Sequence, residues 1–325
     1  MKILILGCGS IGSRHALNLK QLGVKEIVLC DLNQKRANEL GKKLGTKNIF
    51  NDYKIAVKQI PDISAALICI PTRFHIEPSI FLARKKIHLF IEKPLSHNLK
   101  NTKILQNIVK KNRIKIMMGN VYFFDDGFNK IKSLIEKKHI GKILHASYLQ
   151  GQYLPNWHPK MDYRIEYSAR KDMGGGSLLT LTSHSFYVLE WILDEIKKIH
   201  GEWVGTRGSL DIDVDDTAFF LFETKSGIII DSHNDFLSRV HQHKLIIEGE
   251  KGRLEYDFAI KKITILLKNQ KPKIVNVIIN DNDRFLKEMK YFIQLILTKK
   301  QPDKNLKLEK GIHFLQIMKK TLQRL

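Results

Sequence analysis

The feature that most constrains this chain is a glycine-rich motif directly after its first apolar segment. Lys2–Leu6 is an apolar run, which predicts a parallel strand buried on both faces. Glycines follow at the spacing G-x-G-x-x-G, where a predicted helix begins. The first glycine permits a tight turn, the second lets the backbone approach a pyrophosphate, and the third lets the helix pack closely on the strand. The motif predicts a dinucleotide site formed by Gly7, Gly9, Ser10, Ile11 and Gly12.

Asp31 supports this interpretation because it ends the next predicted strand, nineteen residues after Gly12. A carboxylate at this place accepts hydrogen bonds from both hydroxyls of an adenine ribose and repels a 2′-phosphate. The sequence therefore favours NAD over NADP. The neighbouring cations Lys35 and Arg36 keep the NADP alternative open, and a glycine-rich turn with a helix-capping Asp is the purely structural alternative.

The first 120 residues alternate between predicted strands and helices. Apolar runs predict strands at 2–6, 26–30, 65–70, 88–91 and 115–118, and helical periodicity predicts helices at 11–22, 33–44, 78–86 and 101–112. This alternation is typical of an α/β fold in which a doubly wound parallel sheet carries helices on both faces. We expect a Rossmann dinucleotide-binding domain at 1–121.

The pattern changes after Asn120. Helices are predicted at 127–138 and 177–193, strands at 143–150, 201–206, 217–223, 227–235, 242–249, 253–258, 262–267 and 273–279, and closing helices at 283–298 and 308–325. Consecutive strands without intervening helices predict an α+β domain with a large, mostly antiparallel open sheet. We expect this substrate and oligomerisation domain at 122–325, with the C-terminal helix packing back on the first domain.

Composition limits the class of protein. The 55 Lys and Arg residues against 33 Asp and Glu residues give a net charge of +22, but the basic residues are scattered along the whole chain. We interpret them as a solvated lysine coat, with attraction of an anionic substrate as the alternative, and expect no nucleic-acid partner. The three cysteines form no metal or disulfide pattern, and no long apolar run or signal peptide is present. We expect a soluble cytoplasmic protein without a metal or a membrane partner.

Several motifs together resemble the Gfo/Idh/MocA family of NAD(P)-dependent oxidoreductases over nearly the full length. They are GCGSIGSRH (7–15), IPTRFH (70–75), IEKP (91–94), GKIL (141–144), DYR (162–164) and GGGSLLTLTSH (174–184). The stretch 153–191 is most similar to bacterial members of surface-sugar pathways. The resemblance implies an oxidoreductase with NAD as cofactor and a sugar as substrate. It also implies that Pro71, Thr72, His75, Glu92 and Lys93 contact the cofactor.

Lys93 is the first candidate catalytic residue. It follows a buried strand, so its ammonium group emerges at the carboxyl edge of the sheet, where ligands bind in such folds. There it can donate a hydrogen bond to a substrate hydroxyl and stabilise a developing alkoxide. The resemblance implies that Lys93 touches substrate and that a cis peptide shapes the turn Glu92–Lys93–Pro94. The alternative is a solvated surface lysine.

His184 is the second candidate, two turns into the helix that follows the glycine triplet. Histidine titrates near neutrality and can take a proton from a sugar hydroxyl as hydride leaves. The resemblance implies this role, with a buried structural histidine as the alternative. Thr180 departs from the Asp that many relatives carry one turn earlier, and we count it with the catalytic residues of a variant site. Tyr187 and Phe123 also depart from common family residues, an Asp and an Arg.

The loop before the glycine triplet is rich in aromatic residues. Aromatic faces stack on sugar or uracil rings, and an arginine can clamp a carboxylate or phosphate. Packing between domains or subunits is the equal alternative. The predicted substrate residues are Tyr153, Trp157, His158, Tyr163, Arg164 and Tyr187. Asp215, Asp216 and Thr217 match a family strand start, and we expect a structural role for them.

These expectations combine into one leading hypothesis. The chain is expected to transfer hydride between NAD and a sugar, in particular a nucleotide or amino sugar of surface-polysaccharide biosynthesis. One alternative keeps NAD bound and uses transient oxidation for glycoside cleavage or epimerisation, and another is a non-catalytic NAD-binding partner. We expect a homodimer or homotetramer that forms through the second-domain sheet, because its apolar face would otherwise be exposed.

Overall fold

The computed structural model describes residues 1–278 and 280–325 and divides into two compact units. The first comprises Met1–Val121 and Asn282–Leu315, and the second comprises Tyr122–Asp281 and Gln316–Leu325. The segment Asn282–Leu315 thus groups with the first unit, whereas the sequence assigned it to the second domain and expected only the C-terminal helix to pack back on the first. Each unit is described by itself below. The expected strand end at Ile279 lies outside the described residues.

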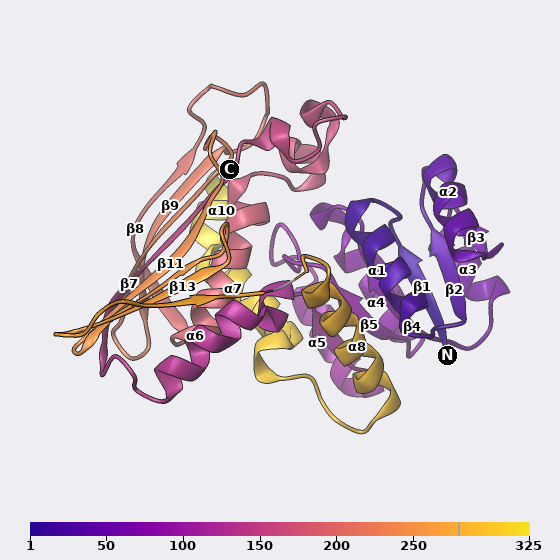
Figure 1. The fold of residues 1–325 in the computed structure, drawn as a ribbon. Helices are drawn as coiled ribbons and strands as arrows, with labels where there is room; N and C mark the ends of the chain where they lie inside the picture. Colours follow the sequence, from indigo (N-terminus) through magenta and orange to yellow (C-terminus); the bar gives the residue numbers. More distant parts are fainter. Residues whose placement is uncertain (279) are drawn as a thin grey trace. The chain divides into compact units, whose positions relative to one another are not determined.

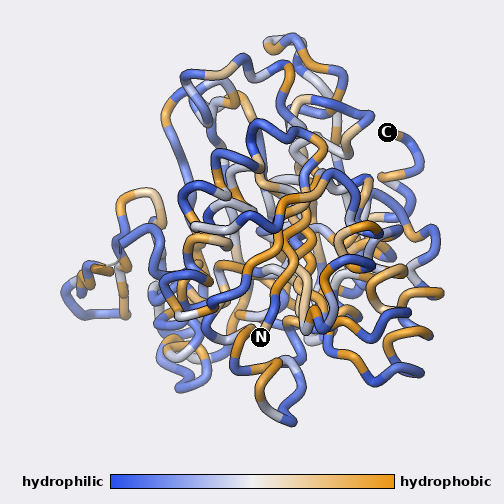
Figure 2. The backbone as a smooth tube through the Cα atoms, turned by 90° about the vertical axis from the view of Figure 1, so that its right-hand side faces the viewer, coloured by the Kyte–Doolittle hydropathy of each residue, from blue (hydrophilic) through white to orange (hydrophobic). Residues whose placement is uncertain are grey.

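The first unit is built on a six-stranded sheet in the order β3-β2-β1-β4-β5-β6, with every pairing parallel. The strands are β1 (Lys2–Leu6), β2 (Glu26–Cys30), β3 (Ile49–Phe50), β4 (Ile63–Ile68), β5 (His88–Ile91) and β6 (Ile116–Met118). The central strands are almost fully buried, as their continuous apolar runs require. Figure 2 shows hydrophobic segments next to the N-terminus, where this sheet begins with β1.

Helices connect the parallel strands. They are α1 (Ser10–Gln21), α2 (Gln34–Leu44), α3 (Tyr53–Gln59), α4 (Ile76–Arg84) and α5 (Thr102–Asn112), which flank the sheet in Figure 1. α1 contacts α2, and α4 contacts α5. The strand order reverses between β1 and β4, which is the switch point where such sheets bind dinucleotides. The doubly wound parallel sheet predicted from the sequence is confirmed.

α8 (Asp283–Leu297) returns to the first unit and packs on α1. Its C-terminal end is held by Lys115, whose ammonium donates hydrogen bonds to the carbonyls of Leu295 and Thr298. Lys115 is only 8% exposed, so this lysine is not part of the solvated coat. A cation at the C-terminal end of a helix also interacts favourably with the helix dipole. α9 (Leu308–Ile317) follows, and Gly311 packs closely on Leu95.

The second unit contains an eight-stranded sheet in the order β14-β13-β12-β11-β7-β10-β9-β8. The strands are β7 (Ile143–Gly151), β8 (Ile196–Gly205), β9 (Thr217–Thr224), β10 (Ile229–Asp235), β11 (Gln242–Gly249), β12 (Gly252–Asp257), β13 (Lys262–Leu267) and β14 (Lys273–Asn276). All pairings are antiparallel except β7 with β10. Residues along β7 and β9 alternate between buried and exposed, so one face is covered and the other is open. The mostly antiparallel open sheet is confirmed.

The covered face carries α6 (Asp126–Glu136), a π-helical turn η7 (Leu178–Thr182), α7 (Ser183–Ile192) and α10 (Lys319–Arg324) (Figure 1). The sequence predicted one α-helix over 177–193, and the π-helical turn differs from it. Two hydroxyl groups bond to carbonyls of the preceding turn: Thr180 donates to Gly176, whose carbonyl also accepts from the N–H of Thr180, and Ser183 donates to Leu179. Side-chain hydrogen bonds of this kind often accompany bent or irregular helices.

Candidate active site

The glycine loop after β1 shows which glycines the chain itself requires. Gly7 has φ +90°, and a Cβ there would lie 2.5 Å from the carbonyl oxygen of Cys69. A Cβ on Gly12 would lie 1.9 Å from the carbonyl oxygen of Gly7. A Cβ on Gly9 would approach nothing closer than Arg36, at 3.8 Å. Gly7 and Gly12 are therefore needed for packing, whereas Gly9 leaves open backbone at the N-terminal end of α1, which suits a pyrophosphate.

Ser10 and Ile11 form the first turn of α1, which contains no acidic side chain. The N-cap residue is Gly9, which has no side chain that could accept a hydrogen bond from the first N–H groups of the helix. Ser10 is exposed, whereas Ile11 is half-buried. The first backbone N–H groups of a helix carry partial positive charge and favour an anion when no side chain caps them. The residues at this loop thus fit the diphosphate of a dinucleotide.

Asp31 lies at the end of β2 and holds the glycine loop. Its Oδ2 accepts a hydrogen bond from the N–H of Cys8 at 2.6 Å, and its Oδ1 accepts one from the N–H of Asn33 at 2.7 Å. The nearest guanidinium nitrogen of Arg36 lies 3.9 Å from Oδ2. Asn33, and not Asp31, caps α2 by accepting from the N–H of Arg36. The carboxylate therefore has a structural role beside the ribose-binding role that the sequence predicts.

The segment after β4 connects two loops at the same sheet edge. Pro71 is half-buried, Thr72 is buried, and η1 (Thr72–Phe74) follows. The imidazole of His75 lies 2.7 Å from the carbonyl oxygen of Ile70 and 3.0 Å from that of Pro94. His75 is 1% exposed, and burial lowers its pKa below the usual value. Its side chain thus joins the β4 loop to the turn after β5 and is covered from solvent.

The turn after β5 carries Glu92 and Lys93 and contains a cis peptide between Lys93 and Pro94. Glu92 Oε1 lies 2.7 Å from Nε2 of the buried His15, and Glu92 Oε2 accepts from the N–H of Lys93 at 3.2 Å. Burial alone would raise the pKa of Glu92, but the hydrogen bond to His15 and the charges of His15 and Lys93 lower it below the usual value. An ionised Glu92 therefore orders the backbone of the lysine turn.

Lys93 is half-buried at the carboxyl end of β5. Burial lowers the pKa of Lys93 to about 8, and the negative charge of Glu92 partly offsets this effect. A lysine whose pKa lies near neutrality can both donate a hydrogen bond to an oxygen and exchange a proton. Perturbed lysines of this kind are typical of functional sites, unlike the surface lysines of this chain.

His184 occupies the first turn of α7 in the second unit, directly after the π-helical turn. It is half-buried, and its ring centroid lies 4.8 Å from that of Tyr122. Thr180 is buried one turn earlier, where its hydroxyl donates to the carbonyl of Gly176 at 2.7 Å. The structure thus places Thr180 and His184 on one irregular helical segment. π-Helical turns frequently occur at functional sites.

Asp215 fixes the start of this segment. Its Oδ2 accepts hydrogen bonds from the Ser177 hydroxyl at 2.9 Å and from the N–H of Leu178 at 2.7 Å. A Cβ on Gly176 would lie 2.1 Å from Asp215 Oδ1, so a glycine at 176 is required for this approach. Burial raises the pKa of Asp215 to about 6. Asp215 has the structural role expected from the sequence, and it positions the helix that carries His184.

The aromatic loop residues pack mainly on their own unit. Tyr153, Trp157 and Tyr163 lie against a small core that includes Leu154 and Phe236. The ring of Trp157 meets that of Phe236 edge to face at 5.3 Å. These contacts give the three aromatic side chains a part in folding the loop within their own unit, whereas the alternative left open by the sequence was packing between domains or subunits.

Charged groups near this loop pair with one another. Arg164 is exposed and binds Asp162 at 2.8 Å and Asp211 at 3.4 Å, and His158 lies 2.7 Å from Glu166. The guanidinium of Arg164 is therefore already paired with carboxylates. Any substrate anion at this arginine would compete with them.

Tyr187 and Phe123, the two other residues that differ from the family pattern, both pack against other side chains. Tyr187 is 4% exposed, and burial raises the pKa of its hydroxyl above the usual value. Phe123 lies in η2 (Val121–Phe124), and its ring centroid lies 4.8 Å from that of Trp191. Both residues thus pack within the second unit, where an Asp or an Arg would require a polar partner.

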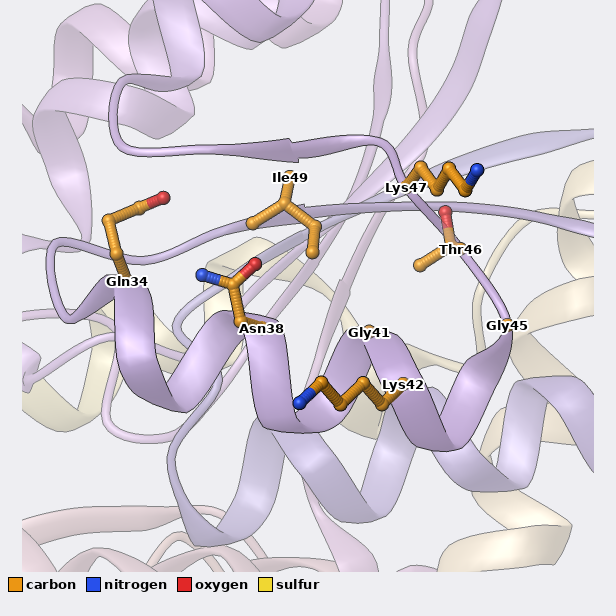
Figure 3. Close-up of a pocket in the computed structure, with 8 residues that line it drawn as sticks. All are labelled: Gln34, Asn38, Gly41, Lys42, Gly45, Thr46, Lys47 and Ile49. Carbon is orange, nitrogen blue, oxygen red and sulfur yellow. The ribbon is translucent and has the colours of Figure 1, made fainter.

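A shallow pocket of about 500 Å³ lies elsewhere, on the outer edge of the first unit (Figure 3). Its lining residues come from α2, β3 and the turn between them: Gln34, Asn38, Gly41, Lys42, Gly45, Thr46, Lys47 and Ile49. None of the predicted site residues lines it. Among the described residues, no group of His, Cys, Asp and Glu could hold a metal ion, and no helix is long and apolar enough to cross a membrane.

Within the first unit, the structure brings the glycine loop, Asp31 and the Glu92–Lys93 turn to one carboxyl edge of the sheet. Within the second unit, Thr180 and His184 lie on one helical segment, and Asp215 accepts hydrogen bonds at the start of that segment. The sequence did not predict the contact of His15 with Glu92, because the two residues are far apart in the chain. His15 itself ends the motif GCGSIGSRH. Sequence reasoning also missed Asn120, a polar residue two positions after the last strand of the first sheet.

Comparison with known proteins places the chain. Residues 1–120 match the model of an oxidoreductase family with an NAD-binding Rossmann fold, and residues 128–255 match the GFO/IDH/MocA C-terminal domain. Myo-inositol 2-dehydrogenase of Thermotoga maritima is 28% identical over 318 residues, which cover 93% of this chain and 90% of that protein. Glucose-6-phosphate 3-dehydrogenase of Bacillus subtilis is 26% identical over 235 residues, covering 70% of this chain and 66% of that protein.

Solved structures give the same fold. Levoglucosan dehydrogenase in complex with NADH and levoglucosan superposes with a TM-score of 0.87 at 18% identity, covering 99% of this chain and 96% of that chain. A probable dehydrogenase from Thermotoga maritima superposes with a TM-score of 0.79 at 25% identity, covering 100% and 97%. With both domain models matched in order, the chain belongs to the Gfo/Idh/MocA family of oxidoreductases, with an NAD-binding Rossmann domain.

Proposed function

We propose that this protein is an NAD-dependent dehydrogenase or reductase that transfers hydride between the nicotinamide and a hydroxyl-bearing carbon of a sugar or polyol. The observation that carries the proposal is the half-buried Lys93, with its lowered pKa, at the same sheet edge as the glycine loop. The named relatives support it, since they act on inositol and on sugars.

The residues of the first unit fit NAD. Gly9 and the uncapped start of α1 would hold the diphosphate, and Asp31 would hold the adenine ribose while it keeps its bond to Cys8. When bound, NAD supplies the hydride acceptor or donor. The carboxylate of Asp31 favours NAD over NADP, because a 2′-phosphate would meet its negative charge.

Two side chains of the chain handle the substrate oxygen in this proposal. The ammonium group of Lys93 donates a hydrogen bond to the reacting oxygen and stabilises negative charge as it develops there. The imidazole of His184 takes the hydroxyl proton during oxidation and returns it during reduction. Thr180 lacks the charge of the common Asp, so His184 works without a carboxylate one turn earlier.

We propose a nucleotide-linked or amino sugar as the substrate within this class. The support is the aromatic loop, in which Trp157 and Tyr163 are only half-buried, whereas the ring of Tyr153 already carries the Arg239 guanidinium 3.6 Å from its centroid. A screen that compares free polyols, free sugars, amino sugars and nucleotide sugars tests the class. Reduced cofactor should form with the last two groups, and activity with polyols alone would contradict this choice.

We also propose that the open face of the second sheet forms the contact of a homodimer or homotetramer. Trp203, Phe219 and Leu221 expose 40%, 43% and 41% of their surface, and Phe219 stacks on His233 with 4.2 Å between ring centroids. An exposed apolar patch of this kind is typical of an interface. Light scattering should give a dimer or tetramer, and a monomer at micromolar concentration would contradict the proposal.

The cysteines support a proposed cytoplasmic location. Cys8, Cys30 and Cys69 are buried and free, and burial raises the pKa values of Cys8 and Cys30 to about 12. Thiols in this state are poor nucleophiles and do not depend on an oxidising compartment.

A further inference from the structure

Asn120 is the second residue after β6, at the sheet edge that carries Lys93. The residue is 2% exposed, yet neither its Oδ1 nor its Nδ2 has a hydrogen-bond partner among the described residues. A buried amide with both polar atoms unpartnered is unfavourable unless something outside the chain supplies a donor and an acceptor. The surroundings of Asn120 therefore point to a ligand.

The backbone of Asn120 is held firmly by two neighbours. Its N–H donates to Oε1 of Glu288 on α8 at 2.9 Å, and Glu288 is 1% exposed. The preceding Gly119 donates to the carbonyl of Ile91 at 2.7 Å, and a Cβ on Gly119 would lie 3.0 Å from Glu92 Oε2. The backbone of Asn120 is thus held close to the turn that carries Lys93.

The topology indicates which part of the cofactor lies here. A dinucleotide crosses a doubly wound sheet at the switch point, here between β1 and β4. The proposed site for the adenine ribose is Asp31, at the end of β2, so the nicotinamide would lie on the other half of the sheet, toward the ends of β4, β5 and β6. Asn120 lies just beyond the carboxyl end of β6, the outermost strand of that half.

We propose that the side-chain amide of Asn120 binds the carboxamide of the nicotinamide, with Glu288 as the positioning residue that holds Asn120. A carboxamide has one carbonyl acceptor and one NH2 donor, and an asparagine amide has the same pair, so two reciprocal hydrogen bonds form. Burial and the charge of Glu92 raise the pKa of Glu288 well above its usual value, so Glu288 adds no second negative charge beside Glu92. This inference rests on the proposed function, because it takes NAD as the bound dinucleotide.

Calorimetric titration with NAD⁺ and with ADP-ribose, which lacks the nicotinamide, tests the assignment. Asn120→Ala should weaken NAD⁺ binding by about 10- to 30-fold through loss of two hydrogen bonds, and leave ADP-ribose binding unchanged. The matched control is Asn18→Ala, because Asn18 is also buried in the first unit but its amide is paired with Asn282 at 2.8 Å. That variant should affect both ligands equally.

A second ligand comparison separates recognition from folding. The 3-acetylpyridine analogue of NAD⁺ keeps the carbonyl and lacks the NH2 group, so wild-type protein should bind it several-fold more weakly than NAD⁺, and Asn120→Ala should lose this preference. Equal weakening of NAD⁺ and ADP-ribose by Asn120→Ala, or no weakening of either, would overturn the assignment while leaving NAD-dependent catalysis intact. Failure of wild-type protein to bind either ligand would overturn the proposed function as well.

Discussion

The side-chain carboxylate of Asp31 accepts a hydrogen bond from the backbone N–H of Cys8, with 2.6 Å between Oδ2 and the nitrogen. The end of β2 is thereby tied to the glycine loop after β1. One negative charge orders the loop and lies where the adenine ribose is proposed to bind, so loop geometry and cofactor choice depend on the same residue.

Replacing Asp31 with Asn should shift the preference from NAD toward NADP by about tenfold. The amide keeps a hydrogen-bond acceptor for one backbone N–H but removes the charge that repels a 2′-phosphate. Dissociation constants for both cofactors measure the shift. Adding Arg36→Gln should reverse the gain for NADP, because Arg36 is the cation 3.9 Å from Asp31. An unchanged NAD to NADP ratio in Asp31→Asn would refute this role.

Lys93→Ala should lower turnover by about 10²- to 10³-fold with little change in NAD affinity, because the lost interaction stabilises charge that develops only in the reaction. Steady-state kinetics with the best sugar, together with NAD titration, measure the two quantities. The control is Lys111→Met, since Lys111 is exposed on α5. Full turnover by Lys93→Ala would remove Lys93 from the mechanism.

The pH dependence follows from the same residue. Burial lowers the pKa of Lys93 to about 8, so the ammonium form is lost as the pH rises past that value. In the reduction direction, log kcat/KM of the wild type should therefore show a decline above about pH 8 that belongs to Lys93, since the ammonium donates to the substrate oxygen. Deprotonation of His184, which returns the proton in this direction, adds a separate decline that both proteins share. The residual activity of Lys93→Ala should lack the decline near pH 8. A decline near pH 8 that persists in the variant would assign the titration to another group.

His184→Gln should lower turnover by about 10²- to 10⁴-fold while NAD binding is retained, as expected for loss of a general acid–base. His200→Gln is the control, because His200 is bound to Glu223 on the second sheet at 2.6 Å, outside the proposed site. Comparable losses in both variants would indicate a folding defect rather than a chemical role.

Asp215 should make stability depend on pH. Burial raises its pKa to about 6 from the usual value of 3.8, so between these values the folded state holds a proton that the unfolded state releases. The free energy of unfolding therefore falls as the pH rises from about 4 to 6, by about 3 kcal/mol from this group, and is constant above. Urea unfolding of wild type and Asp215→Asn at several pH values should show this slope only in the wild type. Parallel slopes would contradict it.

Lys115→Met should lower the free energy of unfolding by about 1–3 kcal/mol, because two carbonyls at the end of α8 lose a charged donor. Lys111→Met removes the same charge from an exposed site and should have a negligible effect. Denaturant titration compares the two. Equal effects would show that α8 does not depend on Lys115.

The first sheet was largely predictable, because buried parallel strands are continuous apolar runs and β1, β2 and β5 match their predicted bounds. β3 and α3 were missed. β3 has only two residues and α3 only seven, and segments this short carry too few periodic positions. Local patterns therefore define the long elements and the sheet type but not the shortest pieces at the sheet edge.

The parts of the candidate site that sequence did not predict depend on tertiary contacts. The π-helical turn before His184 is one such part, because helical periodicity in the sequence does not distinguish it from an α-helix. The return of α8 to the first unit depends on backbone carbonyls that Lys115 reaches. Asn120 and Glu288 are distant in sequence and meet only through that return.

The most direct test of the central claim is the transfer of deuterium from a sugar labelled at the reacting carbon to NAD⁺, with wild-type protein and Lys93→Ala. Wild-type protein should form deuterated NADH in a one-to-one ratio with oxidised sugar, and Lys93→Ala should transfer deuterium at least about 10²-fold more slowly. Product formation without net reduced cofactor would instead indicate a transient oxidation. NAD binding without any transfer, across all sugars and polyols tested, would contradict the account altogether.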